Sequence, residues 1–213
     1  MSEINKRQIS PVNTREEKRL TYRAMLQRYK TAIAHEFYLE AILIDYACLE
    51  DRLRYLLYYI GVIKSESDYK ITGAQSTRIK SYRDILRTYT TPDANMTISS
   101  ISGKRNIVKS VFLMLLDENP RIDLSGITRL LRKQMGDSDR AKQVLELLDR
   151  IENWCKYRNE VIHSLMNKNL DSLYQSLSEK AQEGHVLFRE LDKHVSWVKR
   201  KNIRGKIGLK TEE

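Results

Sequence analysis

The sequence predicts an all-α protein, a helical bundle with three long helices and several short ones. Apolar residues recur at steps of three and four over long stretches, which is the spacing of one face of an α-helix. No alternating run of four to eight residues competes with this pattern. The chain also has only 8 Gly and 3 Pro, whereas a chain of many short strands needs turn residues about every 8 to 12 positions.

The composition fits a globular protein. Hydrophobic residues make up 41% of 213 residues, which is enough to build a core. No stretch of about 18 apolar residues is present, so we expect no transmembrane span. The first 20 residues lack the apolar centre of a secretory signal, so we expect a soluble, cytoplasmic protein. Cys48 and Cys155 are the two cysteines, and we expect free thiols rather than a disulfide or metal pair.

The excess of positive charge is concentrated in three segments. The formal net charge is +10. Residues 1–30 carry 8 basic and 3 acidic residues, residues 64–110 carry 9 and 4, and residues 199–213 carry 6 and 2. This distribution indicates an anionic partner, with nucleic acid favoured over a membrane surface. The remaining explanation is that the positive charge serves only to keep the protein soluble.

The predicted organisation is one helical domain with two extensions. Residues 1–13 read as a flexible N-terminus, residues 14–198 as a single domain, and residues 199–213 as a basic C-terminal tail. Within the domain, residues 64–105 are expected to form a loop or an inserted segment, because polar and turn-forming residues dominate there.

The first two helices are predicted from capping residues and periodicity. Thr14 and Glu17 form a capping-box pattern, in which each side chain bonds a free backbone amide of the first turn. The stretch that follows is too long for one ordinary helix, so a break is expected near residue 30. The second helix covers about 33–60, and Gly61 is a natural stop.

Shorter helices are expected in the middle of the chain. A basic helix is predicted at about 77–89, an apolar one at 106–116, and a third at 126–135. Residues 90–105, between the first two, are expected to be the most mobile loop.

Two long helices complete the domain. Asp137 or Ser138 can cap a helix that ends between 166 and 170. Asp171 or Ser172 can cap the last helix, which continues to the start of the basic tail. Both helices carry apolar residues at helical spacing.

The most informative stretch is Lys156-Tyr157-Arg158-Asn159-Glu160-Val161-Ile162-His163-Ser164-Leu165. On an ideal helix Arg158 and His163 lie about 7.5 Å apart along the axis and about 140° apart around it. One helix therefore would not place both over one phosphate, whereas two copies facing each other across a two-fold axis could. Histidine exchanges protons near neutral pH, and a guanidinium grips phosphate oxygens.

This stretch resembles the signature of the HEPN superfamily, an Arg followed after four to six residues by a His, often with Asn directly after the Arg. Arg158-Asn159-Glu160-Val161-Ile162-His163 fits it. The order of the helices is similar over residues 30–198, whereas the match of individual residues is confined to about ten positions. It implies a compact α-helical bundle that forms a homodimer and, in many members, acts as a metal-independent endoribonuclease.

The Arg–His spacing is not specific by itself. Arg28 and His35 also fit it, as do Arg189 and His194. Asn159, the flanking residues and the position on a long helix single out the pair described above. The pair at residues 189 and 194 reads as an exposed helical face of mixed charge.

The resemblance assigns a role to each residue. His163 acts as general base or acid, and Arg158 stabilises the phosphorane. Asn159 orients that arginine or contacts the phosphate, Glu160 orients the histidine or lies in solvent, and Tyr157 supports the site. No metal or other cofactor is implied. The partners implied are RNA, a second copy and a cognate antitoxin or defence-system protein, in a toxin or anti-phage role.

Three alternatives remain open. The chain could be a non-catalytic all-α module that binds RNA, DNA or a protein through its basic surface. It could instead be a protein that silences a partner toxin. Arg158 and His163 could also belong to a structural ion-pair network, which is the ordinary, non-functional explanation for charged residues on a helix.

Two further charged features carry expectations. Glu50 could pair with Arg158, although Arg54 at i+4 is the favoured partner. The tail 199–213, including Gly205-Lys206-Ile207-Gly208, is expected to be loose and able to grip a phosphate backbone without sequence preference.

Overall fold

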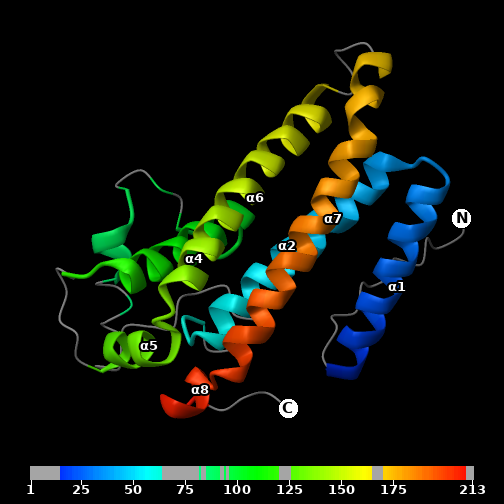
Figure 1. Ribbon diagram of the computed structural model, residues 1–213. Helices are drawn as coiled ribbons and strands as arrows, with labels where there is room; N and C mark the ends of the chain where they lie inside the picture. Colours follow the sequence, from blue (N-terminus) through cyan, green and yellow to red (C-terminus); the bar gives the residue numbers. More distant parts are fainter. Residues whose placement is uncertain are drawn as a thin grey trace, which may run out of the picture.

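The computed structural model describes residues 15–63, 82, 85–91, 94, 96–119, 126–164 and 170–209. These residues form helices and no strands, which confirms the all-α prediction. The helices, drawn in Figure 1, are α1 (Arg15–Ala34), α2 (Tyr38–Tyr59), α4 (Ile101–Leu116), α5 (Ile127–Met135), α6 (Ser138–Ser164), α7 (Leu170–Arg200) and α8 (Ile203–Lys206).

The centre of the bundle is the pair α2 and α7, which make the most extensive helix–helix contact among the described elements. They run in the same direction, and α1 packs beside them in the opposite direction (Figure 1). On the other side α6 runs antiparallel to α7, and α4 packs against α6 and α2. The short helices α5 and α8 lie near each other at one end.

The break between α1 and α2 falls at residues 35–37, later than the expected position near residue 30. Glu36 adopts a left-handed conformation with φ +59°, and the Phe37 amide donates to the Ala32 carbonyl at 2.8 Å. Residues 14–37 contain no Gly or Pro, so α1 continues until the turn itself ends it.

Helix α4 begins five residues earlier than expected and includes part of the predicted loop. Ser100 caps it, since the Ser100 hydroxyl accepts a hydrogen bond from the Gly103 amide at 3.1 Å. A side chain at Gly103 would collide with the backbone of Thr97. The loop assignment for residues 101–105 was therefore wrong, because a serine cap and a close backbone approach start the helix there. The predicted helix 77–89 lies largely outside the described residues, although residues 85–89 are helical.

The cap expected for the long helix α6 is confirmed, and the cap expected for α7 is wrong. The Asp137 carboxylate accepts a hydrogen bond from the Arg140 amide at 3.0 Å. By contrast, α7 is already helical at Leu170, so Asp171 and Ser172 lie inside it. The apolar series at steps of three and four extends back to Leu170, which favours an earlier start than the capping residues indicate. The expected end of α6, between residues 166 and 170, falls almost entirely on residues that lie outside the described part.

The C-terminal residues 201–209 pack onto the bundle, so they do not form the loose tail that was expected. Ile203 is fully buried and Arg204 is 3% exposed. The Arg204 guanidinium donates to the carbonyls of Tyr58 and Ile63 and stacks on the Tyr58 ring at 3.7 Å. This arginine satisfies carbonyls at the end of α2, so it is not available to a phosphate backbone.

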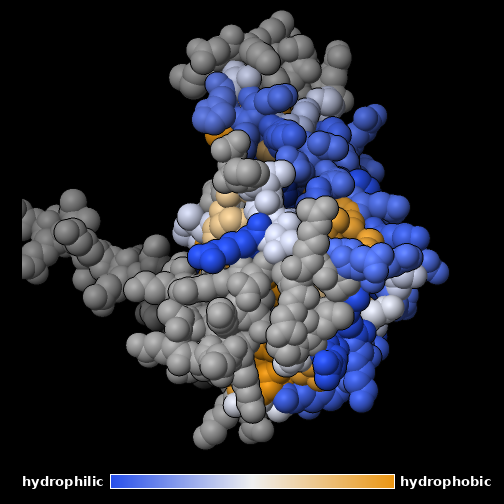
Figure 2. Space-filling model, turned by 90° about the vertical axis from the view of Figure 1, so that its left-hand side faces the viewer, coloured by the Kyte–Doolittle hydropathy of each residue, from blue (hydrophilic) through white to orange (hydrophobic). Residues whose placement is uncertain are grey.

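Polar side chains predominate among the described residues on the side of the molecule shown in Figure 2. Figure 2 shows the face that carries α4, α5 and α6, where the coloured residues are mostly hydrophilic with small hydrophobic areas. Large exposed apolar side chains in the described residues are Leu20, Met25, Phe37, Leu43 and Val186. None of the described helices is both long and apolar enough to cross a membrane.

Candidate functional site

The five residues predicted to form the site all lie on the last turns of α6. This half of the helix is fixed to the bundle by buried Trp154 and Val161. The Trp154 indole N–H donates to the Lys180 carbonyl on α7 at 2.8 Å. The position of each site residue around the α6 axis is therefore set by a well-packed helix rather than by a loop.

Arg158 is half-buried and held between two neutral groups. Its guanidinium carbon lies 4.3 Å from the centre of the Tyr46 ring on α2, a cation–π distance. Its Nη1 donates to the Asn159 side-chain oxygen at 3.0 Å. Among the described residues no carboxylate forms an ion pair with Arg158, and its buried Nε has no hydrogen-bond partner. A charged group with one neutral hydrogen bond retains most of its capacity to bind an anion.

Tyr157 points toward α7. Its hydroxyl shares a hydrogen bond with the Ser176 hydroxyl at 2.6 Å. The Lys180 ammonium lies 5.3 Å from the centre of its ring. Tyr157 therefore joins α6 to α7, on a different side of the helix from the Arg158–Tyr46 contact.

His163, Glu160 and Asn159 are exposed to solvent. In one chain, no hydrogen bond or ion pair joins His163 or Glu160 to Arg158 in the described structure. Arg158 and Asn159 are thus brought together, while His163 stays on the open side of the helix. The separation is what an uninterrupted helix dictates, about 7.5 Å along the axis.

The surroundings of Arg158 contain charged residues that the sequence analysis did not assign to the site. Glu50 pairs with the fully buried Lys104 of α4 at 2.6 Å, so both expected partners of Glu50 were wrong. The adjacent Arg105 pairs with Glu152 of α6 at 3.1 Å. The pairing was missed because it depends on the packing of α4 against α2 and α6, which helical periodicity does not reveal.

Cys155 lies in this same seam between α4 and α6. Burial raises the pKa of its thiol to about 11, and the charges of Arg105 and Arg158 oppose that rise. Cys48 is buried, and both cysteines are free, as expected. A thiol with a raised pKa is protonated at neutral pH and a poor nucleophile, so its role here is packing.

A buried carboxylate and a histidine form a second cluster that the sequence did not predict. Asp45 on α2 is 1% exposed, and its Oδ1 lies 3.3 Å from Nδ1 of His185 on α7. The imidazole stacks on the Tyr29 ring of α1 at 4.3 Å. Burial raises the pKa of Asp45 to about 8. Burial and the charges of Arg189 and Lys30 lower the pKa of His185. Three helices meet here, and no local motif marks the pair.

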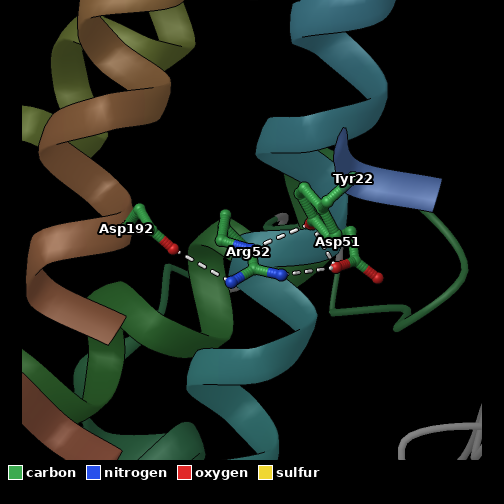
Figure 3. Close-up of polar contacts among 4 residues, drawn as sticks. All are labelled: Tyr22, Asp51, Arg52 and Asp192. Carbon is green, nitrogen blue, oxygen red and sulfur yellow. Dashed lines mark hydrogen bonds and ion pairs between the residues drawn. The ribbon is translucent and has the colours of Figure 1, made fainter. Parts of the chain in front are cut away.

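Arg52 forms a third cluster, shown in Figure 3. Its guanidinium donates to the Tyr22 hydroxyl at 2.9 Å, to Asp192 at 2.9 Å and to Asp51 at 3.2 Å. The Tyr22 hydroxyl donates in turn to Asp51 at 2.5 Å. Because Tyr22 belongs to α1 and Asp192 to α7, Arg52 ties both helices to α2.

The residues described by the structure contain no group of three or more His, Cys, Asp or Glu side chains that could hold a metal ion.

Comparisons of this chain with protein-family models, with curated proteins and with solved structures gave no significant match. The class that the fold defines is therefore an α-helical bundle, and a functional assignment depends on the side chains themselves.

Proposed function

We propose that this chain is a HEPN-like, metal-independent endoribonuclease that cleaves single-stranded RNA as a homodimer. The observation that supports the proposal most directly is the environment of Arg158. The guanidinium is held on the Tyr46 ring, bonded to a neutral amide, and has no carboxylate partner in the described residues. The structural arginine Arg204 donates to two backbone carbonyls, whereas Arg158 donates a single hydrogen bond, to a neutral side-chain amide.

The proposed mechanism divides the chemistry between two residues. His163 removes the proton of the attacking 2′-hydroxyl or donates one to the leaving oxygen, for which an exposed imidazole is suited. Arg158 stabilises the negative charge on the phosphorane oxygens. The products are a 2′,3′-cyclic phosphate and a 5′-hydroxyl, and the two residues of one site come from helices facing each other across a two-fold axis.

The neighbouring residues have positioning roles in this proposal. Asn159 fixes one nitrogen of the Arg158 guanidinium at 3.0 Å, and Tyr46 supports its face. Tyr157 holds α6 on α7 through Ser176 and does not contact RNA. Glu160 is exposed beside the site, where it can orient His163 of the second copy. A role as a toxin or anti-phage effector, with an antitoxin or defence-system partner, is part of the same proposal.

The test is cleavage of a mixed single-stranded RNA ladder by purified protein in excess EDTA. We expect cleavage products with cyclic-phosphate ends, and at least 100-fold slower cleavage by His163→Ala and by Arg158→Ala. His35→Ala is the matched control, because His35 is also an exposed histidine preceded by an arginine at the allowed spacing. This control should cleave at the wild-type rate.

Two results would contradict the proposal. Cleavage that survives both substitutions would show that the site lies elsewhere. Absence of cleavage, together with tight and strongly salt-dependent RNA binding, would favour the non-catalytic binding module instead. Circular dichroism and sedimentation of each variant establish that it remains folded and keeps the oligomeric state of the wild type.

A further inference from the structure

A second polar site lies in a groove between the N-terminal half of α6 and the C-terminal half of α7. The groove encloses about 340 Å³, which is within the range of small-ligand sites. Leu147 lies among its otherwise polar lining. Arg140, Gln143 and Arg150 come from the same stripe of α6, and Lys193 and His194 come from α7.

The charges in the groove leave cations available to an anion. Glu190 is neutralised by Arg150, whose Nη1 lies 2.6 Å from its Oε2. Arg140 and Lys193 form no ion pair in the described part of the chain, and Glu146 is the one further carboxylate of the lining. Two unpaired cations therefore face a single unpaired carboxylate, so the groove has a net positive charge.

Arg140 is partly positioned before any ligand binds. Its guanidinium carbon lies 5.2 Å from the centre of the Trp197 ring, a side chain that is 7% exposed. The Lys201 ammonium lies 5.3 Å from the same ring. Stacking on a buried aromatic ring restricts the arginine side chain, which reduces the entropy lost when it binds an anion.

His194 adds a neutral hydrogen-bonding group to these cations. Burial and the charge of Arg140 lower its pKa, while Glu190 opposes this and Lys193 adds to it. A neutral imidazole has one donor and one acceptor, and the nearby Gln143 amide has both as well. The groove thus combines charge for a phosphate with neutral donors and acceptors, and Leu147 supplies an apolar contact.

From this combination we propose that the α6–α7 groove binds a phosphate monoester of nucleotide size. Arg140 and Lys193 hold the phosphate, and Gln143 and His194 bond the remainder of the ligand against Leu147. The phosphate monoester belongs either to a free mononucleotide or to the terminal phosphate of an RNA strand. The site is distinct from Arg158, which follows Arg150 by eight residues, about 12 Å along α6, and faces Tyr46 of α2.

The first test is equilibrium binding by isothermal titration calorimetry with the full chain. The probes are adenosine 5′-monophosphate, adenosine, inorganic phosphate, and 2′-O-methyl pentanucleotides with and without a 5′-phosphate. We expect the two nucleotide-sized phosphate monoesters to bind at least 10-fold more tightly than adenosine or the 5′-hydroxyl oligomer. Tighter binding of adenosine 5′-monophosphate than of the phosphorylated oligomer identifies a free nucleotide, and the reverse order identifies an RNA end.

Variants locate the binding in the groove. Arg140→Gln combined with Lys193→Gln should weaken binding of the preferred probe at least 10-fold. Lys142→Gln, an exposed α6 lysine outside the groove, should change it less than 2-fold. His163→Ala should bind as the wild type does, so failure of the nuclease proposal and failure of this one remain distinguishable.

Histidine NMR gives a readout that overall folding defects do not imitate. Binding of adenosine 5′-monophosphate should raise the pKa of His194 by at least half a unit, because a phosphate dianion stabilises a nearby imidazolium, and it should leave the ring resonances of His35 where they are in the free protein. The proposal is overturned if no phosphate monoester binds, if Lys142→Gln weakens binding as much as the double variant does, or if inorganic phosphate binds as tightly as the nucleotides.

Discussion

Asp45 is a carboxyl group whose environment disfavours its charge. It is buried at the junction of α1, α2 and α7, its Oδ2 has no hydrogen-bond partner among the described residues, and its only bond is to His185. The pKa of about 8 follows from loss of hydration. At neutral pH the proton is therefore retained on a side chain that is ionised in the unfolded chain.

This difference predicts a pH dependence of stability. Because the folded pKa of Asp45 lies above its unfolded value, its contribution is fully present below about pH 4 and is lost as pH rises toward 8. Asp45→Asn should come closest to the wild type in free energy of unfolding near pH 4 and exceed it by about 2–5 kcal/mol at pH 8. Urea unfolding at both pH values measures this.

Comparing the two proteins isolates the carboxyl group, since both retain His185. The pKa of His185 is lowered, so its own contribution has the opposite sign and increases as pH rises toward 6.5 in both proteins. A constant difference between wild type and Asp45→Asn across the pH range would contradict the assignment.

Gly184 is a position where the packing of neighbouring side chains leaves no room for a Cβ atom. A Cβ placed there would lie 2.5 Å from Cζ2 of Trp154 and 3.2 Å from Oδ2 of Asp45. Gly184→Ala should lower the free energy of unfolding by about 1–3 kcal/mol, although alanine is the better helix former. Thermal unfolding beside Gln182→Ala, an exposed position on the same helix, checks this. A stabilised Gly184→Ala protein would show that α6 and α7 pack less closely than described.

At the scale of elements, α1 depends on few side chains for its place on the bundle. Tyr22 bonds Asp51 and Arg52, and Tyr29 stacks on His185 and bonds the Ala181 carbonyl. Arg52 is the common member of the first set, lying over the Tyr22 ring at 4.2 Å and bonding Asp192 of α7 (Figure 3). Loss of this one guanidinium removes links to two helices.

Arg52→Met should therefore loosen α1 more than the rest of the molecule. The change leaves Asp51 and Asp192 without their guanidinium and should cost about 2–4 kcal/mol. Hydrogen–deuterium exchange should show faster exchange across residues 15–34, with α5 exchanging as in the wild type. Arg23→Met, at an exposed position of α1, serves as the control. Uniform acceleration across all helices would indicate global destabilisation and contradict a local role.

The helices were largely predictable, and the contacts between them were not. Periodicity and capping residues located α5, α6 and the end of α2, because helix formation is governed by residues three and four apart. The starts of α4 and α7 differed from prediction because packing and an unrecognised Ser100 cap decided them. Of the candidate site, the sequence predicted the position of Arg158 on a long helix. The Tyr46 contact and the Lys104–Glu50 pair require the tertiary arrangement.

At the scale of the whole molecule, the C-terminal residues 201–209 cover one end of the helical bundle. Arg204 bonds two carbonyls at the end of α2 and stacks on Tyr58, and the neighbouring Ile203 is fully buried. A cation at a helix C-terminus also interacts favourably with the helix dipole. Among the described basic residues of this region, Arg204 is structural, Lys201 is half-buried, and Lys199, Arg200 and Lys206 are exposed.

Arg204→Met should destabilise the entire fold. The Tyr58 and Ile63 carbonyls would lose their shared partner inside the protein, at a cost of about 2–4 kcal/mol. Chemical denaturation should show a lower midpoint for this variant, whereas Arg200→Met, at the exposed end of α7, should unfold as the wild type does. Equal midpoints for Arg204→Met and the wild type would show that the Arg204 hydrogen bonds contribute nothing to global stability.

The bonds of Arg204 to α2 also bear on how the protein is made. They join residues 146 and 141 positions apart in the chain. At about 5–20 residues per second, a ribosome takes about 7–30 s to add that length. During this time α2 has neither its α7 partner nor its terminal arginine, so its apolar face is open to chaperones and proteases. Completion of this fold therefore waits for the synthesis of α7 and α8, and nascent chains that stop before α7 expose the interior of the bundle.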